Sequence, residues 1–350
     1  MVKRRTSLLG AMLRVGKQQQ RSAVRMLGAL MAPPPAAAKP RRPRTVRPPP
    51  AAAGTWLALG FANLTGRMRY WLYLPACARA GADGPLPLAV MLHGCDQTAT
   101  SFADGSRMNA LAEKAGYAVL YPQQSATSHP HRCWKWYDRA TQQGGGDAEL
   151  IAGVVRAVLA AYPIDRRRVY IGGISAGAAM AQIVALNHPE LFAALGMHSG
   201  PVFGAGHGGM GALAVMQHGA SARAGAAIDE VLLRQPGRAC LPAIVIHGED
   251  DTVVRPVNQL QVAEQALQLN GMGAGSAVTE KLTVKPATRR TLGYRMRDLY
   301  RGRKLMLRVV RIAGLEHAWS GGDGRFKFNS AAGPDASKML LDFFSRHQLT

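Results

Sequence analysis

The sequence predicts an α/β fold in which helices cover both faces of a mostly parallel sheet. Short apolar runs alternate with longer helical patterns from about residue 55 onward, and this alternation is typical of such a sheet. The chain has 350 residues, of which 47% are apolar, so it can build a full-sized core. A glycine-flanked serine at 173–177 lies between a predicted strand and a predicted helix. In this fold we expect catalytic groups on loops beyond the carboxyl ends of strands.

The expected strands and helices follow one another in a regular order. Short apolar runs predict strands at 70–74, 88–93, 117–121, 169–172, 193–197, 243–247 and 305–312. Helical spacing of apolar residues predicts helices at 105–115, 147–162, 176–187, 256–268 and 335–346. Together they predict one catalytic domain over residues 56–350.

The first 55 residues differ from the rest in composition. They contain twelve Lys and Arg and no acid, and eight of the 21 prolines. We expect a basic, proline-rich tail and linker, either disordered or forming in part an amphipathic helix that contacts an anionic surface. The basic start at 3–9 is not followed by a long apolar stretch, so no clear export signal is predicted.

A second basic cluster lies at residues 281–311, where eleven Lys and Arg face only Asp298. The remaining chain is neutral, with 20 basic and 20 acidic residues. We favour a solvated hairpin face for this cluster. Both basic clusters also support an alternative, in which the chain is mainly a module that binds polymer granules, an anionic membrane or nucleic acid, the last being disfavoured, and any catalytic site is secondary. Arg289, Arg290, Arg295 and Arg297 of the second cluster would take part in this binding.

Several classes of protein are excluded. No uncharged apolar run approaches the roughly 18 residues that a membrane-spanning helix needs. The four cysteines form no Cys-x-x-Cys pair and no zinc-finger spacing with histidine, so we expect no metal. No organic cofactor is implied, and the sequence assigns no role to Cys77 or Cys240.

Ser175 is the candidate nucleophile, because the motif at 173–177 matches a nucleophile elbow. A serine hydroxyl needs an imidazole to accept its proton and a carboxylate to orient that imidazole. In this fold the chain order is Ser, acid, His. Only His317 and His347 follow the acidic cluster at 249–251, and His317 directly follows a predicted strand. We therefore expect His317 to be the base.

The acid and the oxyanion donors are less determined by the sequence. Glu249, Asp250 and Asp251 all follow the strand at 243–247, and the residues alone favour none of them. The backbone N–H of Ala176 is expected to bind the oxyanion. A second N–H should come from the loop at 93–97, in which His93 is expected to serve packing and turn formation.

These motifs, taken in order, resemble the polyhydroxybutyrate depolymerase family of esterases, with its feruloyl and acetylxylan esterase relatives. The resemblance runs from about residue 70 to 344. It is carried by His93-Gly94-Cys95-Asp96-Gln97, Cys133-Trp134-Lys135-Trp136, residues 164–180, His247-Gly248-Glu249-Asp250-Asp251-Thr252-Val253, Gly314-Leu315-Glu316-His317-Ala318-Trp319 and Gly333-Pro334-Asp335-Ala336-Ser337.

The resemblance implies an α/β-hydrolase fold and narrows the open choices. It implies Asp251 as the acid and the N–H of Cys95 as the second oxyanion donor. It also implies a Cys95–Cys133 disulfide, the alternative being two buried thiols. The family is typically extracellular, so it implies an extracellular or periplasmic location, with the cytoplasm as the alternative.

The expected activity is hydrolysis of carboxylic esters by Ser175, Asp251 and His317. The resemblance implies a poly- or oligo(3-hydroxyalkanoate) ester as substrate, the polymeric form being a hydrophobic polyester. Feruloyl, acetylxylan or general short-chain esters are the alternative. The aromatic side chains of the motifs either wall the acyl pocket or pack in the core; they are Trp134, Trp136, Tyr137 and Trp319.

Overall fold

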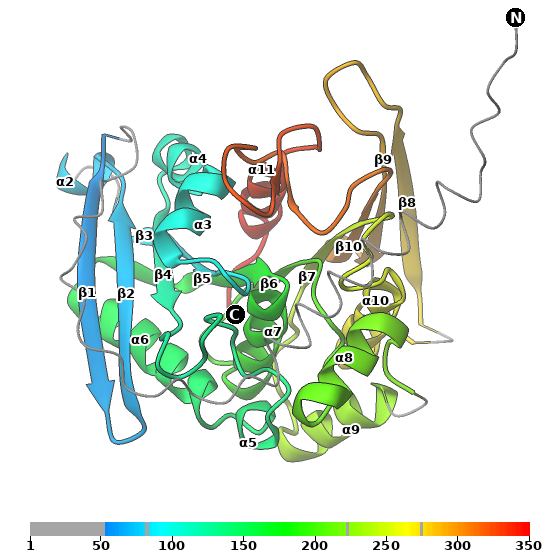
Figure 1. Ribbon diagram of the computed structural model, residues 1–350, viewed down its shortest axis with the longest axis horizontal. Helices are drawn as coiled ribbons and strands as arrows, with labels where there is room; N and C mark the ends of the chain where they lie inside the picture. The colour runs from blue at the N-terminus through cyan, green and yellow to red at the C-terminus, as the bar shows by residue number, and fades with distance from the viewer. Residues whose placement is uncertain (1–52, 81–83, 222–223, 274–275) are drawn as a thin grey trace, which may run out of the picture.

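The computed structural model describes residues 53–80, 84–221, 224–273 and 276–350 (Figure 1). The tail predicted for residues 1–55 lies almost entirely outside the described residues. The first described strand begins at Thr55, close to the predicted start of the catalytic domain.

One large sheet crosses the described chain. Its ten strands lie in the order β1-β2-β4-β3-β5-β6-β7-β10-β9-β8. Neighbours from β4 to β10 in this order are parallel, and the pairs at both ends are antiparallel. The strands are β1 Thr55–Asn63, β2 Gly66–Leu74, β3 Leu86–Leu92, β4 Ala118–Gln123, β5 Ile164–Ile174, β6 Ala194–His198, β7 Ala243–Gly248, β8 Val278–Lys285, β9 Tyr294–Arg301 and β10 Lys304–Ile312.

Helices cover both faces of this sheet (Figure 1). They are α2 Cys77–Ala80, α3 Ala99–Ser106, α4 Met108–Ala115, α5 Arg139–Gln142, α6 Asp147–Ala161, α7 Ala176–Asn187, α8 Gly208–His218, α9 Ala224–Arg234, α10 Val257–Leu269 and α11 Ala336–Phe344. A short parallel pair, β11 Trp319–Ser320 and β12 Asn329–Ser330, lies outside the main sheet.

Strand β3 shows why the sheet is covered on both sides. All seven of its residues are buried. Leu88, Val90 and Leu92 belong to the core cluster that contains α6, α7 and α10 residues. Ala89 and Met91 belong to the second cluster, with α3, α4 and α11 residues. Alternate side chains thus enter two cores, as expected for a parallel strand between two helical layers.

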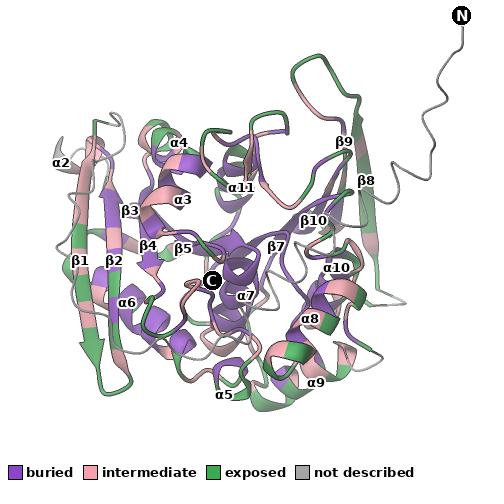
Figure 2. Cartoon of the chain, viewed as in Figure 1, coloured by how far each residue is buried: buried purple, intermediate pink, exposed green. Residues whose placement is uncertain are grey.

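The structure departs from the predicted elements at the edges. The helix predicted at 105–115 corresponds to α4, which begins at Met108, and most of α3 at 99–106 was not predicted. The two helices are separate because Arg107 between them has a φ of 56°, which a continuous helix cannot include. Strands β1, β8 and β9 and helices α8 and α9 were not predicted. β1 and β8 are edge strands with many exposed residues (Figure 2). β8 lacks the apolar run by which the central strands are recognised, whereas the apolar run of β1 at 56–62 was overlooked.

The basic cluster at 281–311 forms the hairpin of β8 and β9, followed by β10. Two of its arginines are paired: Arg297 with Glu280 and Arg308 with the buried Asp298, each through two hydrogen bonds. Other members are exposed and form no ion pair within the described chain, among them Lys285, Arg289, Arg290 and Arg295.

Candidate active site

Ser175 occupies the sharp turn between β5 and α7. Its φ of 56° lies in a region that side-chain-bearing residues rarely adopt. Its N–H donates to the carbonyl oxygen of His198 at 2.9 Å. A Cβ on Gly173 would lie 2.5 Å from the Leu92 carbonyl oxygen, and a Cβ on Gly177 would overlap the same atom. The two glycines let the turn approach β3 closely and present Ser175 beyond the end of the sheet.

Asp251 and His317 come together from two neighbouring strands. Asp251 follows β7 and His317 follows β10, and these strands are paired in parallel, so both loops leave the same edge of the sheet. His317 Nδ1 and Asp251 Oδ2 are 2.7 Å apart. Asp251 Oδ1 accepts the N–H groups of Val253 and Val254 at 3.0 and 2.9 Å. The carboxylate is therefore held on both oxygens.

The other two acids of the cluster point elsewhere. Glu249 and Asp250 are exposed, and their N–H groups donate to the carbonyl oxygens of Ile312 and Leu315. Of the three acids, only Asp251 contacts His317 in the described chain. The structure thus brings His317 together with the acid that the family resemblance implied.

Buried groups around Asp251 favour its charged form. Burial alone would raise the pKa of Asp251, but His317, His247 and the N–H of Val254 outweigh this effect and lower the pKa below its ordinary value. His247 lies on the far side of the carboxylate, with Nε2 3.5 Å from Oδ2, and donates to the carbonyl oxygen of Val254 at 2.7 Å. Burial lowers the pKa of His247, and the nearby Asp251 carboxylate partly opposes this effect.

The backbone around Cys95 leaves one N–H group unused. The Gly94 N–H donates to Gln97 Oε1 at 2.8 Å, and the Asp96 N–H donates to the His131 carbonyl oxygen at 2.6 Å. Within the described chain, no hydrogen bond uses the N–H of Cys95 that lies between them. Cys95 lines the same cavity as Ser175, so this N–H is available to an anionic oxygen there.

The N–H of Ala176 is available for a different reason. Ala176 is the first residue of α7, and the first N–H groups of a helix have no partner within the helix. The helix dipole also favours negative charge at this end. Ala176 lines the cavity beside Ser175.

A disulfide holds the Cys95 loop against the loop that contains the tryptophans. Cys95 and Cys133 are bonded, and they lie 38 residues apart in the sequence. The neighbouring Trp134 Nε1 donates to the His93 carbonyl oxygen at 2.9 Å. His93 is fully buried, accepts the Gln124 N–H at 3.1 Å and has its pKa lowered to about 4 by burial. It is a packing residue of this loop.

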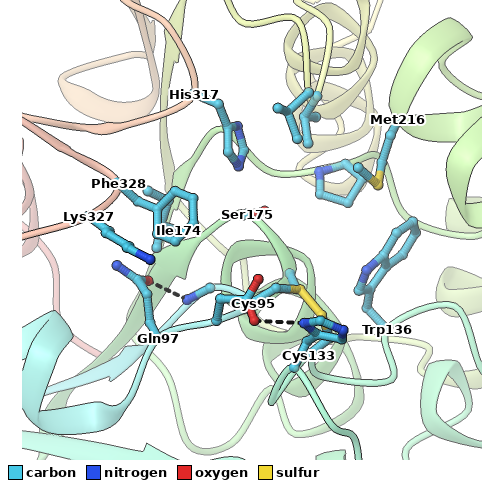
Figure 3. A pocket seen from close by; sticks show the side chains of 17 residues that line it. Cys95, Gln97, Cys133, Trp136, Ile174, Ser175, Met216, His317, Lys327 and Phe328 are labelled. Carbon is cyan, nitrogen blue, oxygen red and sulfur yellow. Dashed lines mark hydrogen bonds and ion pairs between the residues drawn. A yellow bond between two sulfur atoms is a disulfide. The ribbon is translucent and has the colours of Figure 1, made fainter. Parts of the chain in front are cut away.

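Ser175, His317 and the residues of the two candidate oxyanion donors, Cys95 and Ala176, line one cavity of about 700 Å³ (Figure 3). Ser175 and His317 both line it, although no hydrogen bond joins their side chains in the described chain. Such bonds often form only when substrate binds. Most of the wall is apolar, from Cys133, Trp136, Ile174, Pro201, Met216, Val253, Val254 and Phe328.

The aromatic residues of the motifs lie in different places. Trp136 lines the cavity. Tyr137 packs edge-on against Trp136 and is not part of the cavity wall. Trp134 and Trp319 are fully buried outside the wall. The Trp319 Nε1 donates to Ser337 Oγ at 3.1 Å, and its ring stacks on His198.

Sequence reasoning missed several residues of the wall. Met216 comes from α8, which was not predicted, and Lys327 and Phe328 come from the segment between β11 and β12. No sequence signal marks them, because each reaches the cavity through tertiary packing. Gln97 and Asp96 belong to a motif that was recognised, but their side-chain positions could not be inferred.

The described residues contain neither a cluster of metal ligands nor a helix that could span a membrane. No group of three or more His, Cys, Asp and Glu side chains there is arranged to hold a metal ion. No helix among those described has the length and apolar character to cross a membrane.

Comparison with known proteins identifies the family. Residues 68–284 match the family described as esterase PHB depolymerase. The chain belongs to this family. The matched segment contains Ser175 and Asp251, and His317 lies beyond it. The resemblance inferred from the motifs is thereby confirmed.

The individual relatives of this chain are named as depolymerases or esterases. Poly(3-hydroxyalkanoate) depolymerase C of Paucimonas lemoignei is 31% identical over 215 residues, covering 61% of this chain and 51% of that protein. Feruloyl esterase B of Neurospora crassa is 32% identical over 166 residues, 45% of this chain and 54% of that protein. A probable acetylxylan esterase A of Aspergillus fumigatus is 37% identical over 115 residues, covering 32% and 30%. The chain spans about half or less of the length of these relatives.

Solved structures share the fold. An acetyl xylan esterase from Aspergillus awamori superposes with a TM-score of 0.63 at 19% identity, over 83% of this chain and 99% of that one. A dienelactone hydrolase-like promiscuous phosphotriesterase from metagenomic libraries gives 0.52 at 14% identity, over 85% and 100%. The predicted α/β-hydrolase fold is confirmed.

Proposed function

We propose that this chain is a serine hydrolase of carboxylic esters that works through an acyl-enzyme. The observation that carries the proposal is the 2.7 Å hydrogen bond between His317 and Asp251 at the cavity that Ser175 also lines. A nucleophile, a base and an orienting acid in one cavity are the parts that acyl transfer needs.

In the proposed first step, Ser175 Oγ attacks the ester carbonyl carbon. Nδ1 of His317 is bound to Asp251, so Nε2 is the nitrogen that accepts the serine proton. Asp251 stabilises the imidazolium that forms. The free N–H groups of Cys95 and Ala176 donate to the oxyanion of the tetrahedral intermediate.

In the second step His317 gives its proton to the alkoxide leaving group, and the alcohol departs. Water then enters, His317 accepts one of its protons, and the hydroxide attacks the acyl-serine carbonyl. Collapse of this second intermediate returns the proton to Ser175 and releases the acid.

We propose esters or short oligomers of 3-hydroxyalkanoates as the substrate class. The name of the Paucimonas lemoignei relative supports this choice, and the apolar wall suits an aliphatic chain. A cavity of about 700 Å³ is of the size that encloses one small ligand, which favours an oligomer. Feruloyl and acetyl esters are the alternative, supported by the names of two other relatives.

The test is a comparison of substrates with wild type and Ser175→Ala. The substrates are p-nitrophenyl esters from acetate to octanoate, a 3-hydroxybutyrate trimer, methyl ferulate and acetylated xylan. We expect turnover of aliphatic esters and the trimer, and its loss in Ser175→Ala. If methyl ferulate or acetylated xylan were hydrolysed faster than the aliphatic esters and the trimer, the proposed substrate class would be wrong, and feruloyl or acetyl esters would take its place. Turnover retained by the variant would overturn the serine mechanism.

A further inference from the structure

One wall of the cavity is built by a short segment with a constrained backbone. Trp319 in β11 donates its N–H to the Phe328 carbonyl oxygen at 2.7 Å, and β11 pairs with β12 immediately after Phe328. The Asn329 side chain donates to the Lys327 carbonyl oxygen at 3.0 Å. These contacts hold Lys327 and Phe328 at the cavity wall.

Phe328 adopts a φ of 61°, which is unusual for a bulky side chain. Such a conformation persists only where its surroundings hold it, and these conformations cluster at ligand sites. Lys327 directly precedes Phe328, so the same short segment places both side chains at the cavity wall.

Lys327 supplies an uncompensated charge to the cavity. It is the only Lys or Arg among the described residues that line the wall. Its ammonium group forms no ion pair or hydrogen bond within the described chain. Within the part of the chain that the structure describes, Asp96 is the one carboxylate that lines the cavity, and its Oδ1 lies 2.8 Å from His131 Nδ1 and forms no ion pair with Lys327. The ammonium group is thus free to bind an anion that enters the cavity.

Figure 3 shows how this charge lies relative to the candidate nucleophile. Lys327 enters the view beside Gln97 and Phe328, on the side away from Trp136 and Met216, and Ser175 lies between the two sides. A ligand that extends across Ser175 would therefore contact the Lys327 ammonium group at one end of the cavity and the apolar side chains of Trp136 and Met216 at the other end.

We propose that Lys327 forms a carboxylate-binding subsite, and that the preferred substrates are ester oligomers that carry a free carboxylate. This inference rests on the proposed ester hydrolysis at Ser175. An ammonium group forms strong, charge-assisted hydrogen bonds with a carboxylate. A linear hydroxyalkanoate oligomer has one carboxylate per molecule, at its acid end. With that end at Lys327 and the rest of the chain on the apolar wall, an ester bond of the oligomer lies over Ser175.

The test compares a linear 3-hydroxybutyrate trimer with its methyl ester, which differs only in the charge of the acid end. kcat/KM is measured for wild type, Lys327→Met and Lys327→Arg. Lys304→Met is the matched control, because Lys304 is exposed at the start of β10, outside the cavity wall. p-Nitrophenyl acetate, which has no carboxylate, reports the state of the catalytic groups.

We expect wild type to favour the acid over the methyl ester by about fivefold to tenfold, the range of a partly exposed charge pair. Lys327→Met should abolish this preference through KM, while Lys327→Arg and Lys304→Met keep it. Turnover of p-nitrophenyl acetate should stay within about twofold of wild type in Lys304→Met. The preference of each variant is taken as the ratio of kcat/KM for the acid to kcat/KM for the methyl ester, so a change in the catalytic groups that affects both substrates cancels. A high salt concentration should reduce the wild-type preference. An unchanged preference in Lys327→Met would overturn the subsite while leaving ester hydrolysis intact.

A binding measurement separates the two proposals. Calorimetry with Ser175→Ala, alone and combined with Lys327→Met, measures the affinity for the trimer acid and for its methyl ester without turnover. If wild type hydrolyses no ester, the proposed function fails, and tighter binding of the acid that depends on Lys327 still supports the subsite. Equal affinity in both variants, or no binding of the acid, overturns it.

Discussion

The centre of the sheet and the β8–β9 hairpin are made of the same kind of element and have opposite properties. Strands β3, β6 and β7 are wholly buried, and β5 is buried from Val169 to Ile174. The loops that follow β5 and β7 hold Ser175 and Asp251. The hairpin is exposed along β8, where even Leu282 and Val284 are more than half accessible (Figure 2). The candidate catalytic residues Ser175 and Asp251 thus follow strands that lie between two helical layers. The hairpin instead carries exposed cations without an ion pair in the described chain, namely Lys285, Arg289, Arg290 and Arg295.

This comparison predicts large, substrate-independent effects at the centre and small, salt-dependent effects at the hairpin. The largest effect is expected at the acid. Asp251→Asn should lower kcat for p-nitrophenyl butyrate by about 10³- to 10⁴-fold, because the His317 ring loses its orienting carboxylate. Asp250→Asn, at the exposed neighbouring acid, should stay within about twofold. A larger loss in the Asp250 variant would reassign the acid.

The second effect is on stability. Cys133→Ser removes the disulfide to Cys95, which closes a loop of 38 residues, and should lower the free energy of unfolding by about 2–4 kcal/mol. Denaturant unfolding measures this change. Cys77→Ser, at a free cysteine, is the control and should have little effect. Equal stability of Cys133→Ser and wild type under oxidising conditions would show that the Cys95–Cys133 disulfide contributes nothing to the free energy of unfolding.

The third effect is the pH dependence of the free energy of unfolding, which reports whether the interior histidines are buried in their neutral form. Burial lowers the pKa of His93 and His347 to about 4, and burial together with nearby His247 and His317 lowers that of His198 to about 3. Below about pH 6.5 the unfolded chain binds protons that the folded chain does not, so stability falls as the pH is lowered toward 4.

His347→Leu tests this directly, because neither ring nitrogen of His347 has a hydrogen-bond partner in the described chain. Removing one such histidine should reduce the loss of unfolding free energy between pH 7 and pH 5 by about 1–2 kcal/mol. The measurement is urea unfolding at the two pH values. A pH dependence identical to that of wild type would mean that His347 is not buried in its neutral form.

The smallest effect is expected at the hairpin. A triple variant, Arg289→Gln, Arg290→Gln and Arg295→Gln, leaves the Arg297–Glu280 pair intact and should change turnover of p-nitrophenyl butyrate by less than about twofold. Sedimentation with phosphatidylglycerol vesicles measures whether the hairpin binds an anionic surface. If it does, binding should weaken with salt and with each removed charge, by about 1 kcal/mol apiece. Binding that survives both changes would exclude an electrostatic contact of these residues.

The same comparison explains what the sequence could predict. The central strands are continuous apolar runs, and the glycines around Ser175 mark a turn that no other residue permits, so both features can be recognised in the sequence alone. The choice among Glu249, Asp250 and Asp251 cannot be made from the sequence pattern. It depends on which carboxylate contacts His317, and Asp251 and His317 are 66 residues apart in the chain. The choice came from the family resemblance.

The cavity wall was the least predictable part. Trp134 and Trp136 are two residues apart in one loop, yet only Trp136 lines the cavity, because the Trp134 ring is tied to the His93 carbonyl oxygen. Lys327 and Phe328 reach the wall through the pairing of β11 with β12, two strands of two residues that leave no periodic signal. Such residues are found only when the packed structure is known.

The most direct test of the account is covalent labelling of the nucleophile. Wild type, Ser175→Ala and His317→Ala are incubated with a p-nitrophenyl alkylphosphonate, which phosphonylates activated serine hydroxyls, and the adduct is located by peptide mass spectrometry. The account predicts one adduct per chain, on Ser175, absent in Ser175→Ala and formed far more slowly in His317→Ala. An adduct on another residue, or equal labelling of Ser175→Ala and wild type, would contradict it.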